Sequence, residues 1–186
     1  MTECELIRAV KNSDQAAFRL LSRQYYTQLY GFIWRRTGDA EAAKDILQDL
    51  FLNIWRLREN LDESRSIKPY LFASANNLII NHIKRKSAHN SMFADISPDE
   101  LSGNTQDINE YLDDVLKDIP EKLRIVFIMN KFEGFKYSEI AEMLEISEKT
   151  VESRMSSILK ILRKKFIHMT TLILTFIILR IVFLQL

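Results

Sequence analysis

Residues 137–165 read YSEIAEMLEISEKTVESRMSSILKILRKK, and this stretch decides the fold of the C-terminal half of the chain. Its first part has three apolar residues at the i, i+1 and i+4 positions of a short helix, namely Ile140, Ala141 and Leu144. Residues 145–147 interrupt the pattern. Ser147 is a typical N-cap, and Glu148 follows at the first helical position, where a carboxylate suits the helix dipole. A second helix is therefore predicted from Glu148.

The second helix has two contrasting sides. Its apolar stripe consists of Val151, Met155, Ile158, Leu159 and Leu162. Its opposite side consists of Lys149, Thr150, Ser153, Arg154, Ser157 and Lys160. A short helix, a three-residue turn and a helix with a polar, basic face predict a helix-turn-helix, whose second helix enters the major groove of DNA. The alternative is an ordinary helical hairpin with a solvated face.

Composition predicts an all-α protein whose charge is unevenly distributed. A hydrophobic fraction of 47% is sufficient for packed cores, whereas Gly 4 and Pro 3 are too few for a β-rich fold with many tight turns. The net charge is only +1, but residues 87–118 hold 1 basic and 8 acidic side chains, while residues 1–86 hold 14 and 10 and residues 119–165 hold 10 and 7. An acidic stretch thus separates two basic modules, a segregation that favours nucleic-acid contact.

Several classes of function find no support in the sequence. Cys4 is the only cysteine, and the three histidines are scattered, so neither a disulfide framework nor a metal site is predicted. No nucleophile–base pair or phosphate-binding loop is present. We expect no enzyme activity and no cofactor. The N-terminus lacks the basic-then-apolar pattern of a signal peptide, which favours a cytoplasmic location.

Apolar periodicity divides the chain into two helical domains. In the first, residues 5–86, it indicates three or four helices, of which three are clear: residues 14–36, 40–58, and a helix starting near Pro69 and ending in the basic run at 84–86. Residues 87–107 are rich in Ser, Asn, Asp and Gly and are predicted to be a flexible acidic linker. The second domain, residues 108–165, includes a helix opened by Pro120 and ended by Gly134.

Two helical modules joined by an acidic linker, in this order, resemble the extracytoplasmic-function (ECF) sigma factors of bacterial RNA polymerase over about residues 5–166. The run AAKDILQDLFLNIW at 42–55 resembles the polymerase-binding helix of that family. The resemblance implies that this helix binds the clamp helices of the largest polymerase subunit. The residues implied are Asp45, Gln48, Asp49 and Leu52, which recur at helical spacing. A solvated helix face would carry similar charges.

Residues 70–86 resemble the family's helix that opens the minus-ten promoter element. The resemblance implies DNA contacts for Asn77, Lys84, Arg85 and Lys86, the last three through phosphates. It also implies that the loop at 60–68 captures a flipped base. Tyr70 and Phe72 could stack on bases, although aromatic residues at helical spacing more often belong to the core. Two positions depart from the family pattern, which usually has Arg at Asn76 and Asp at Asn81.

Residues 119–141 and 146–154 resemble the family's minus-thirty-five reader. The implied contacts in the groove are Thr150, Ser153 and Arg154, with Ser157 beside them. Lys149, Lys160 and Lys164 are implied phosphate contacts. Glu145 stands where the family often has Gly, which would cost roughly 1 kcal/mol if this residue is left-handed.

The tail, residues 166–186, lies outside this resemblance. As a helix it would span about 31 Å, close to the thickness of the bilayer hydrocarbon. The basic run at 163–165 would then remain on the cytoplasmic side. The tail is therefore either a membrane-spanning helix, tethering the protein to the cytoplasmic face of the inner membrane, or a hydrophobic extension that packs on the protein or on a partner.

The resemblance thus implies a sigma factor that binds core RNA polymerase and directs initiation at promoter DNA. An anti-sigma factor is a further partner that the resemblance allows. The alternative is a stand-alone helix-turn-helix regulator that works without core polymerase. The polymerase-binding pattern around Asp45 and Trp55 favours the sigma factor, because a regulator of duplex DNA has no need of it.

Overall fold

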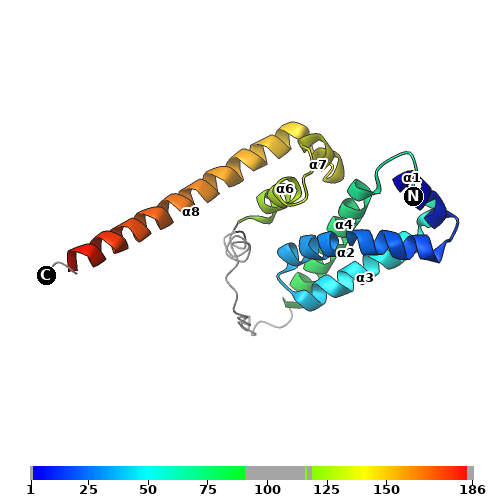
Figure 1. Ribbon diagram of the computed structural model, residues 1–186, viewed down its shortest axis with the longest axis horizontal. Coiled ribbons are helices and arrows are strands. Elements are labelled where there is room, and N and C mark those ends of the chain that lie inside the picture. Colours follow the sequence, from blue (N-terminus) through cyan, green and yellow to red (C-terminus); the bar gives the residue numbers. More distant parts are fainter. Residues whose placement is uncertain (1, 91–115, 117–118, 184–186) are drawn as a thin grey trace. The chain divides into compact units, whose positions relative to one another are not determined.

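The computed structural model describes residues 2–90, 116 and 119–183, and the side chains of residues 2–86, 116 and 119–165. The secondary structure of the described residues is helical, which confirms the predicted all-α class (Figure 1). The helices divide between two compact units, an N-terminal one and a C-terminal one.

The first unit contains α1 (Glu3–Lys11), α2 (Gln15–Thr37), α3 (Ala40–Arg56), the short 3-10 helix η1 (Arg58–Asn60) and α4 (Ile67–Asn90). Helices α2 and α3 agree with the prediction to within two residues. The sequence indicated three or four helices in this domain, and α1 is the fourth. Its signal was a Thr2-x-x-Glu5 capping box, in which the Thr2 side chain accepts from the Glu5 N–H and the Glu5 carboxylate accepts from the Thr2 N–H.

The corner between α2 and α3 has a clear local cause. Gly38 ends α2 with φ of 66°, a left-handed conformation that glycine adopts without a steric cost. Asp39 then caps α3, because its carboxylate accepts the backbone N–H groups of Glu41 and Ala42. Pro69 lies in the first turn of α4, where its missing N–H removes no helical hydrogen bond.

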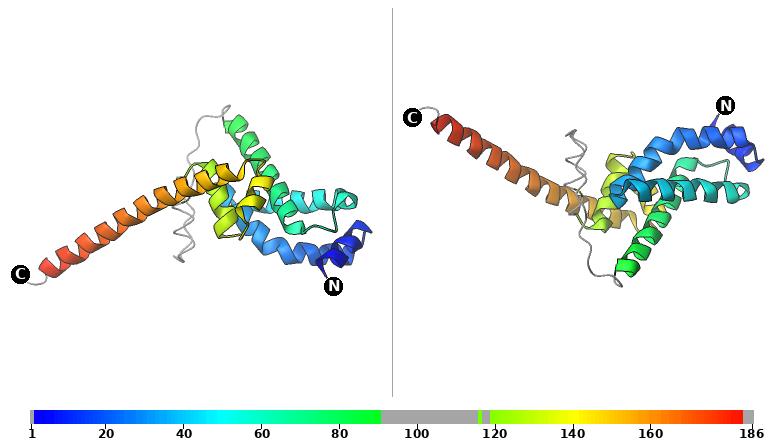
Figure 2. Two further views of the ribbon diagram at one scale, coloured as in Figure 1. Left: turned by 90° about the horizontal axis from the view of Figure 1, so that it is seen from above. Right: turned by 90° about the horizontal axis from the view of Figure 1, so that it is seen from below.

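Helices α2, α3 and α4 pack side by side around one core, and α1 packs against α2 (Figure 2). The largest fully buried side chains of this core are Leu21, Leu29, Phe32, Ile33, Leu47, Leu50, Ile54, Leu71, Phe72 and Ile79. Their spacing of three and four residues is the periodicity from which the helices were predicted.

The first predicted boundary needs a small correction. The linker was predicted to begin at residue 87, but α4 continues to Asn90. The helical pattern ends in a basic run at Lys86, yet the following Ser, Ala and His do not prevent another turn. Residues 91–107 of the predicted linker lie outside the described residues.

The second unit contains α6 (Glu121–Lys131), α7 (Tyr137–Met143) and α8 (Glu148–Phe183), and α6 packs against α8. Pro120 precedes α6, and Gly134 follows it with φ of 77°, both as predicted. The core contains Val126, Ile128, Ile140, Val151, Met155, Ile158 and Leu162. Leu159, predicted to belong to the apolar stripe, is instead 42% exposed, because it lies at the edge of the buried side of α8.

Helix α8 continues without a break from the helix-turn-helix into the tail, as far as Phe183 (Figure 2). The tail side chains, residues 166–186, lie outside the described residues. Within the described part of the chain, no helix is both long and apolar enough to cross a membrane.

Candidate protein and nucleic-acid interfaces

Helix α3 presents an exposed acidic face on the side away from the core. Asp45, Gln48, Asp49 and Leu52 are all exposed, and Leu52 retains 46% of its accessible surface. We call these four residues the α3 face. The prediction that they share one accessible side of a helix is confirmed, whereas their role in binding stays a prediction.

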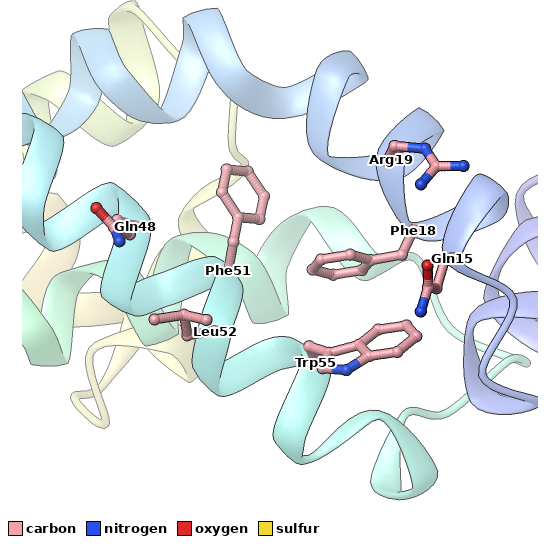
Figure 3. Close-up of a pocket in the computed structure, with 7 residues that line it drawn as sticks. All are labelled: Gln15, Phe18, Arg19, Gln48, Phe51, Leu52 and Trp55. Atoms are coloured by element: carbon pink, nitrogen blue, oxygen red, sulfur yellow. The ribbon is translucent and has the colours of Figure 1, made fainter.

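Beside the α3 face is an open hollow with a volume of about 420 Å³ (Figure 3). We call it the α2–α3 hollow. It is lined by Gln15, Phe18 and Arg19 from α2 and by Gln48, Phe51, Leu52 and Trp55 from α3. Gln48 and Leu52 therefore belong to both features. Phe18, Phe51 and Trp55 follow the apolar periodicity of their helices, but the sequence could not indicate that they line a surface hollow, because the residues come from two helices.

The aromatic walls of the α2–α3 hollow are held in place by their neighbours. The rings of Phe18 and Trp55 lie 4.9 Å apart, and those of Phe18 and Phe51 lie 6.3 Å apart in an edge-to-face arrangement. The Arg58 guanidinium lies 4.8 Å from the centre of the Trp55 ring and donates to the Trp55 carbonyl oxygen. The hollow is consequently a preformed feature of the unit.

On α4 the structure separates the residues that the sequence left ambiguous. Phe72 is fully buried and its ring lies 5.0 Å from that of Phe32, so it belongs to the core. Tyr70 is 41% exposed. Asn76 is buried and accepts a hydrogen bond from the guanidinium of buried Arg36, so this departure from the family pattern concerns the interior.

The predicted minus-ten residues on α4, Asn77, Lys84, Arg85 and Lys86, are all exposed. Lys86 also interacts within the protein, since its Nζ lies 3.9 Å from Asp39 Oδ2. The backbone N–H of Ala42, followed by that of Glu41 and by the charge of Lys86, lowers the pKa of the Asp39 carboxyl. Lys84 and Arg85 therefore remain the stronger candidates for phosphate contacts.

The helix-turn-helix forms as predicted from α7, the turn at 144–147 and the first turns of α8. Glu145 has φ of 53°, so the residue that replaces the family's Gly is indeed left-handed. Ser147 caps α8, because its Oγ accepts the Thr150 N–H at 3.1 Å. The hydroxyl oxygens of Ser147 and Thr150 also lie 2.7 Å apart, so the Thr150 hydroxyl is engaged in the cap.

The remaining predicted groove residues lie along the outer side of α8. Ser153 and Ser157 are exposed and Arg154 is half-buried. The Ser157 hydroxyl donates to the Ser153 carbonyl oxygen at 2.9 Å. Lys149 and Lys160 are exposed. Arg154 is thus the one groove candidate with a long charged side chain, the type that reads bases most strongly. In the described residues, no group of three or more His, Cys, Asp or Glu side chains could hold a metal ion.

The structure thus has two exposed helix surfaces, one acidic beside an apolar hollow and one polar and basic in a helix-turn-helix, the arrangement expected of a modular helical DNA-binding protein that also has a protein partner. Comparison with known families makes this class specific. Residues 21–89 match the model of Sigma-70 region 2, and residues 109–162 match that of Sigma-70 region 4.

Curated relatives agree over most of the chain. It is 31% identical over 135 residues to the RNA polymerase sigma factor YlaC of Bacillus subtilis, covering 67% of this chain and 77% of the relative. It is 26% identical over 176 residues to the ECF RNA polymerase sigma factor SigW of the same organism, covering 86% and 94%. It is also 26% identical to the RNA polymerase sigma-H factor of Pseudomonas aeruginosa, covering 81% and 86%.

Solved structures share the fold. The sigma factor RpoE of Bartonella quintana, in complex with the anti-sigma factor NepR, matches with a TM-score of 0.71 at 17% identity, covering 79% of this chain and 94% of that one. CnrH in complex with the cytosolic domain of CnrY matches with a TM-score of 0.69 at 19% identity, covering 88% and 96%.

The chain belongs to the ECF sigma factors of bacterial RNA polymerase. It is a factor that works with core polymerase on promoter DNA and directs transcription initiation. These matches confirm the predicted class, a sigma factor, rather than the alternative of a stand-alone regulator.

Proposed function

We propose that this sigma factor binds core polymerase through the α3 face together with the α2–α3 hollow. The observation that carries the proposal is that the two features are continuous, since Gln48 and Leu52 belong to both. An apolar depression bordered by charged groups has the arrangement of a protein interface, in which a buried apolar centre is surrounded by a polar rim.

The chemistry of these surfaces specifies the partner's surface. The carboxylates of Asp45 and Asp49 require basic side chains opposite them. The aromatic walls of the hollow, Phe18, Phe51 and Trp55, fit a large aliphatic side chain. A helix that carries both kinds of side chain on one face meets these requirements. This supports the clamp helices of the largest polymerase subunit as the partner.

For the minus-ten element, we propose that α4 and the preceding loop contact the opened DNA. Exposed Tyr70 offers a ring for stacking, and Asn77 offers an amide for hydrogen bonds. Lys84 and Arg85 provide phosphate contacts, which fix the position of the DNA without specifying its sequence. Buried Phe72 has no part in this contact.

For the minus-thirty-five element, α8 is the reading helix of the proposal. Arg154 has the fork of donors that pairs with guanine in the major groove, and Ser153 and Ser157 provide shorter contacts beside it. Thr150 contributes mainly by capping the helix, because its hydroxyl is engaged with Ser147. Lys149 and Lys160 contact phosphates. The acidic segment between the modules is proposed to pass through the nucleic-acid channels of the polymerase.

We further propose a cytoplasmic location, where polymerase and promoters are found, and an anti-sigma factor as a regulatory partner, in line with the two solved complexes named above.

The tail is either a tether to the cytoplasmic face of the membrane or a packing segment. A chain ending at Lys165 distinguishes these alternatives. Under tethering, the full chain sediments with membranes and the shortened chain does not. Soluble full-length protein without a partner excludes tethering.

The direct test is promoter-dependent run-off transcription with purified core polymerase. We expect transcripts only when the full chain, core polymerase and a promoter with both boxes are present. A promoter that lacks the minus-thirty-five box is the matched control. Transcription that proceeds equally without core-binding residues Asp45 and Asp49 would contradict the assignment of the α3 face.

A further inference from the structure

The segment between α3 and α4 has buried ends and an exposed middle. Leu61 and Ile67 are each 4% exposed and anchor the two ends. Between them, Asp62 Oδ1 accepts the Ser64 N–H at 2.9 Å and the Ser64 hydroxyl at 2.6 Å. These two hydrogen bonds, of which the hydroxyl's is the larger cause, lower the pKa of the Asp62 carboxyl. We call residues 61–66 the α3–α4 loop.

Helix α1 supplies the cap of α4. The Glu3 carboxylate accepts the backbone N–H of Ile67 at 2.9 Å and the Ser66 hydroxyl at 3.1 Å. Ile67 is the first residue of α4, so its N–H has no partner within that helix. Glu3 satisfies this donor from a position 64 residues away and places a negative charge at the helix N-terminus.

A second contact from α1 reaches the middle of the loop. Arg8 Nε donates to Glu63 Oε2 at 2.8 Å, and this contact raises the pKa of the Arg8 guanidinium. Further along the chain, Arg58 Nε donates to the hydroxyl of Ser13, which links the end of α1 to η1. Helix α1 therefore contacts the loop at two points, at Glu63 in its middle and at Ser66 at its end.

Helix α1, which supplies these contacts and which we call the brace, is held in place by apolar packing that does not depend on them. Leu6, Ile7 and Val10 of α1 are at most 5% exposed. Burial, with the charge and hydrogen bond of Glu3 as further causes, raises the pKa of Tyr25 on α2. The Arg8–Glu63 ion pair is exposed and contributes little to folding, so together with the Glu3 cap of α4 it favours one conformation of the loop without stabilising the unit as a whole. Restricting a loop before it binds lowers the entropy lost on binding.

We propose that Glu3 and Arg8 are positioning residues that hold the α3–α4 loop in the conformation that receives an unpaired promoter base. This inference rests on the proposed function, in which this loop contacts the opened minus-ten strand. Neither side chain need touch DNA. Their effect is transmitted through the backbone of Ile67 and the side chain of Glu63.

The test uses holoenzyme assembled from core polymerase and the full chain. The probe is a single-stranded minus-ten oligonucleotide with 2-aminopurine at the base to be captured, whose fluorescence rises on unstacking. We expect Glu3→Ala with Arg8→Ala to weaken binding of this strand by about five- to tenfold, with the core affinity and the affinity for minus-thirty-five duplex unchanged. Thermal melting of each variant shows whether the unit remains folded.

A charge exchange separates positioning from general damage. Arg8→Glu alone should weaken strand binding, because it places a second negative charge beside Glu63, and Arg8→Glu with Glu63→Arg should restore it. Arg65→Ala, a change on the exposed loop itself, tests the loop's assigned role. If Arg65→Ala weakens strand binding but the α1 variants do not, the brace is refuted and the loop's role stands. If neither changes strand binding while run-off transcription proceeds, the loop assignment in the proposed function fails, and the brace fails with it.

Discussion

Helices α3 and α8 both bury a regular apolar stripe and expose the opposite side, yet their exposed sides are constructed differently. On α8, every candidate DNA contact from Lys149 to Lys160 comes from one helix. On α3, the surface is completed by Phe18 of α2, which closes one wall of the α2–α3 hollow. A single-helix face can be predicted from periodicity, whereas a composite surface requires knowledge of how helices pack. The predictions below test this difference.

The largest expected effect is on the α3 face. Changing both Asp45 and Asp49 to Lys should abolish association with core polymerase, because the two introduced lysines would face a basic surface of the partner and be repelled by it. Thermal stability should change little, since both side chains are exposed. Co-purification with core polymerase measures the first effect and thermal melting the second. Glu59→Lys, at a side chain 79% exposed outside the face, is the control. Co-purification of the double variant at the wild-type level would contradict the assignment of the α3 face to core binding.

The second largest effect is expected for the exposed face of α8, whose residues all come from one helix. Arg154→Ala should weaken binding to minus-thirty-five duplex by about 1–3 kcal/mol and relax the preference at one base position, if the contact is bidentate. Lys160→Ala should weaken binding to all sequences alike and reduce the salt slope by about 1. Titrations against a set of single-base promoter variants measure both. A uniform loss for Arg154→Ala would instead assign it a phosphate contact.

The composite surface can be tested with a matched pair of leucines. Leu52 is 46% exposed and lines the hollow, and Leu57 is 48% exposed outside it. Leu52→Ala should weaken core binding by about 1–2 kcal/mol, as truncation of an apolar residue at an interface centre does. Leu57→Ala should have no effect on core binding. Equal affinities for the two variants would show that the hollow is not part of the interface.

The smallest expected effect concerns the turn of the helix-turn-helix. Glu145→Gly should raise the free energy of unfolding by roughly 0.5–1 kcal/mol, because glycine adopts the left-handed conformation without steric cost. Glu152→Gly, at an exposed position inside α8, should lower it by about 1 kcal/mol. Denaturant titration of both variants provides the comparison. A loss of stability for Glu145→Gly would mean that its side chain contributes more than the backbone strain costs.

Individual residues show how far sequence reasoning reached. The Ser147 cap and the left-handed conformation at Gly134 could be predicted, because each depends on the chain within a few residues. The sequence left the conformation of Glu145 open, and only the structure shows it to be left-handed. Phe72 and Tyr70 could not be distinguished, since both have helical spacing and only the position of α2 decides which is buried. Leu159 was wrongly assigned to the core for a related reason: the width of a buried stripe depends on the helix packed against it.

The sequence by itself determined the limits of α2 and α3 to within two residues, the order of the two modules, and which residues share the exposed faces of α3 and α8. These features repeat at the helical period or depend on neighbouring residues, so one-dimensional spacing is sufficient to specify them. Only the tertiary structure decided the α2–α3 hollow, the buried pair of Arg36 and Asn76, and the brace from α1 to the α3–α4 loop. Each joins residues from different parts of the fold, 40 to 64 positions apart for the last two, and such contacts are set by packing that no local pattern encodes.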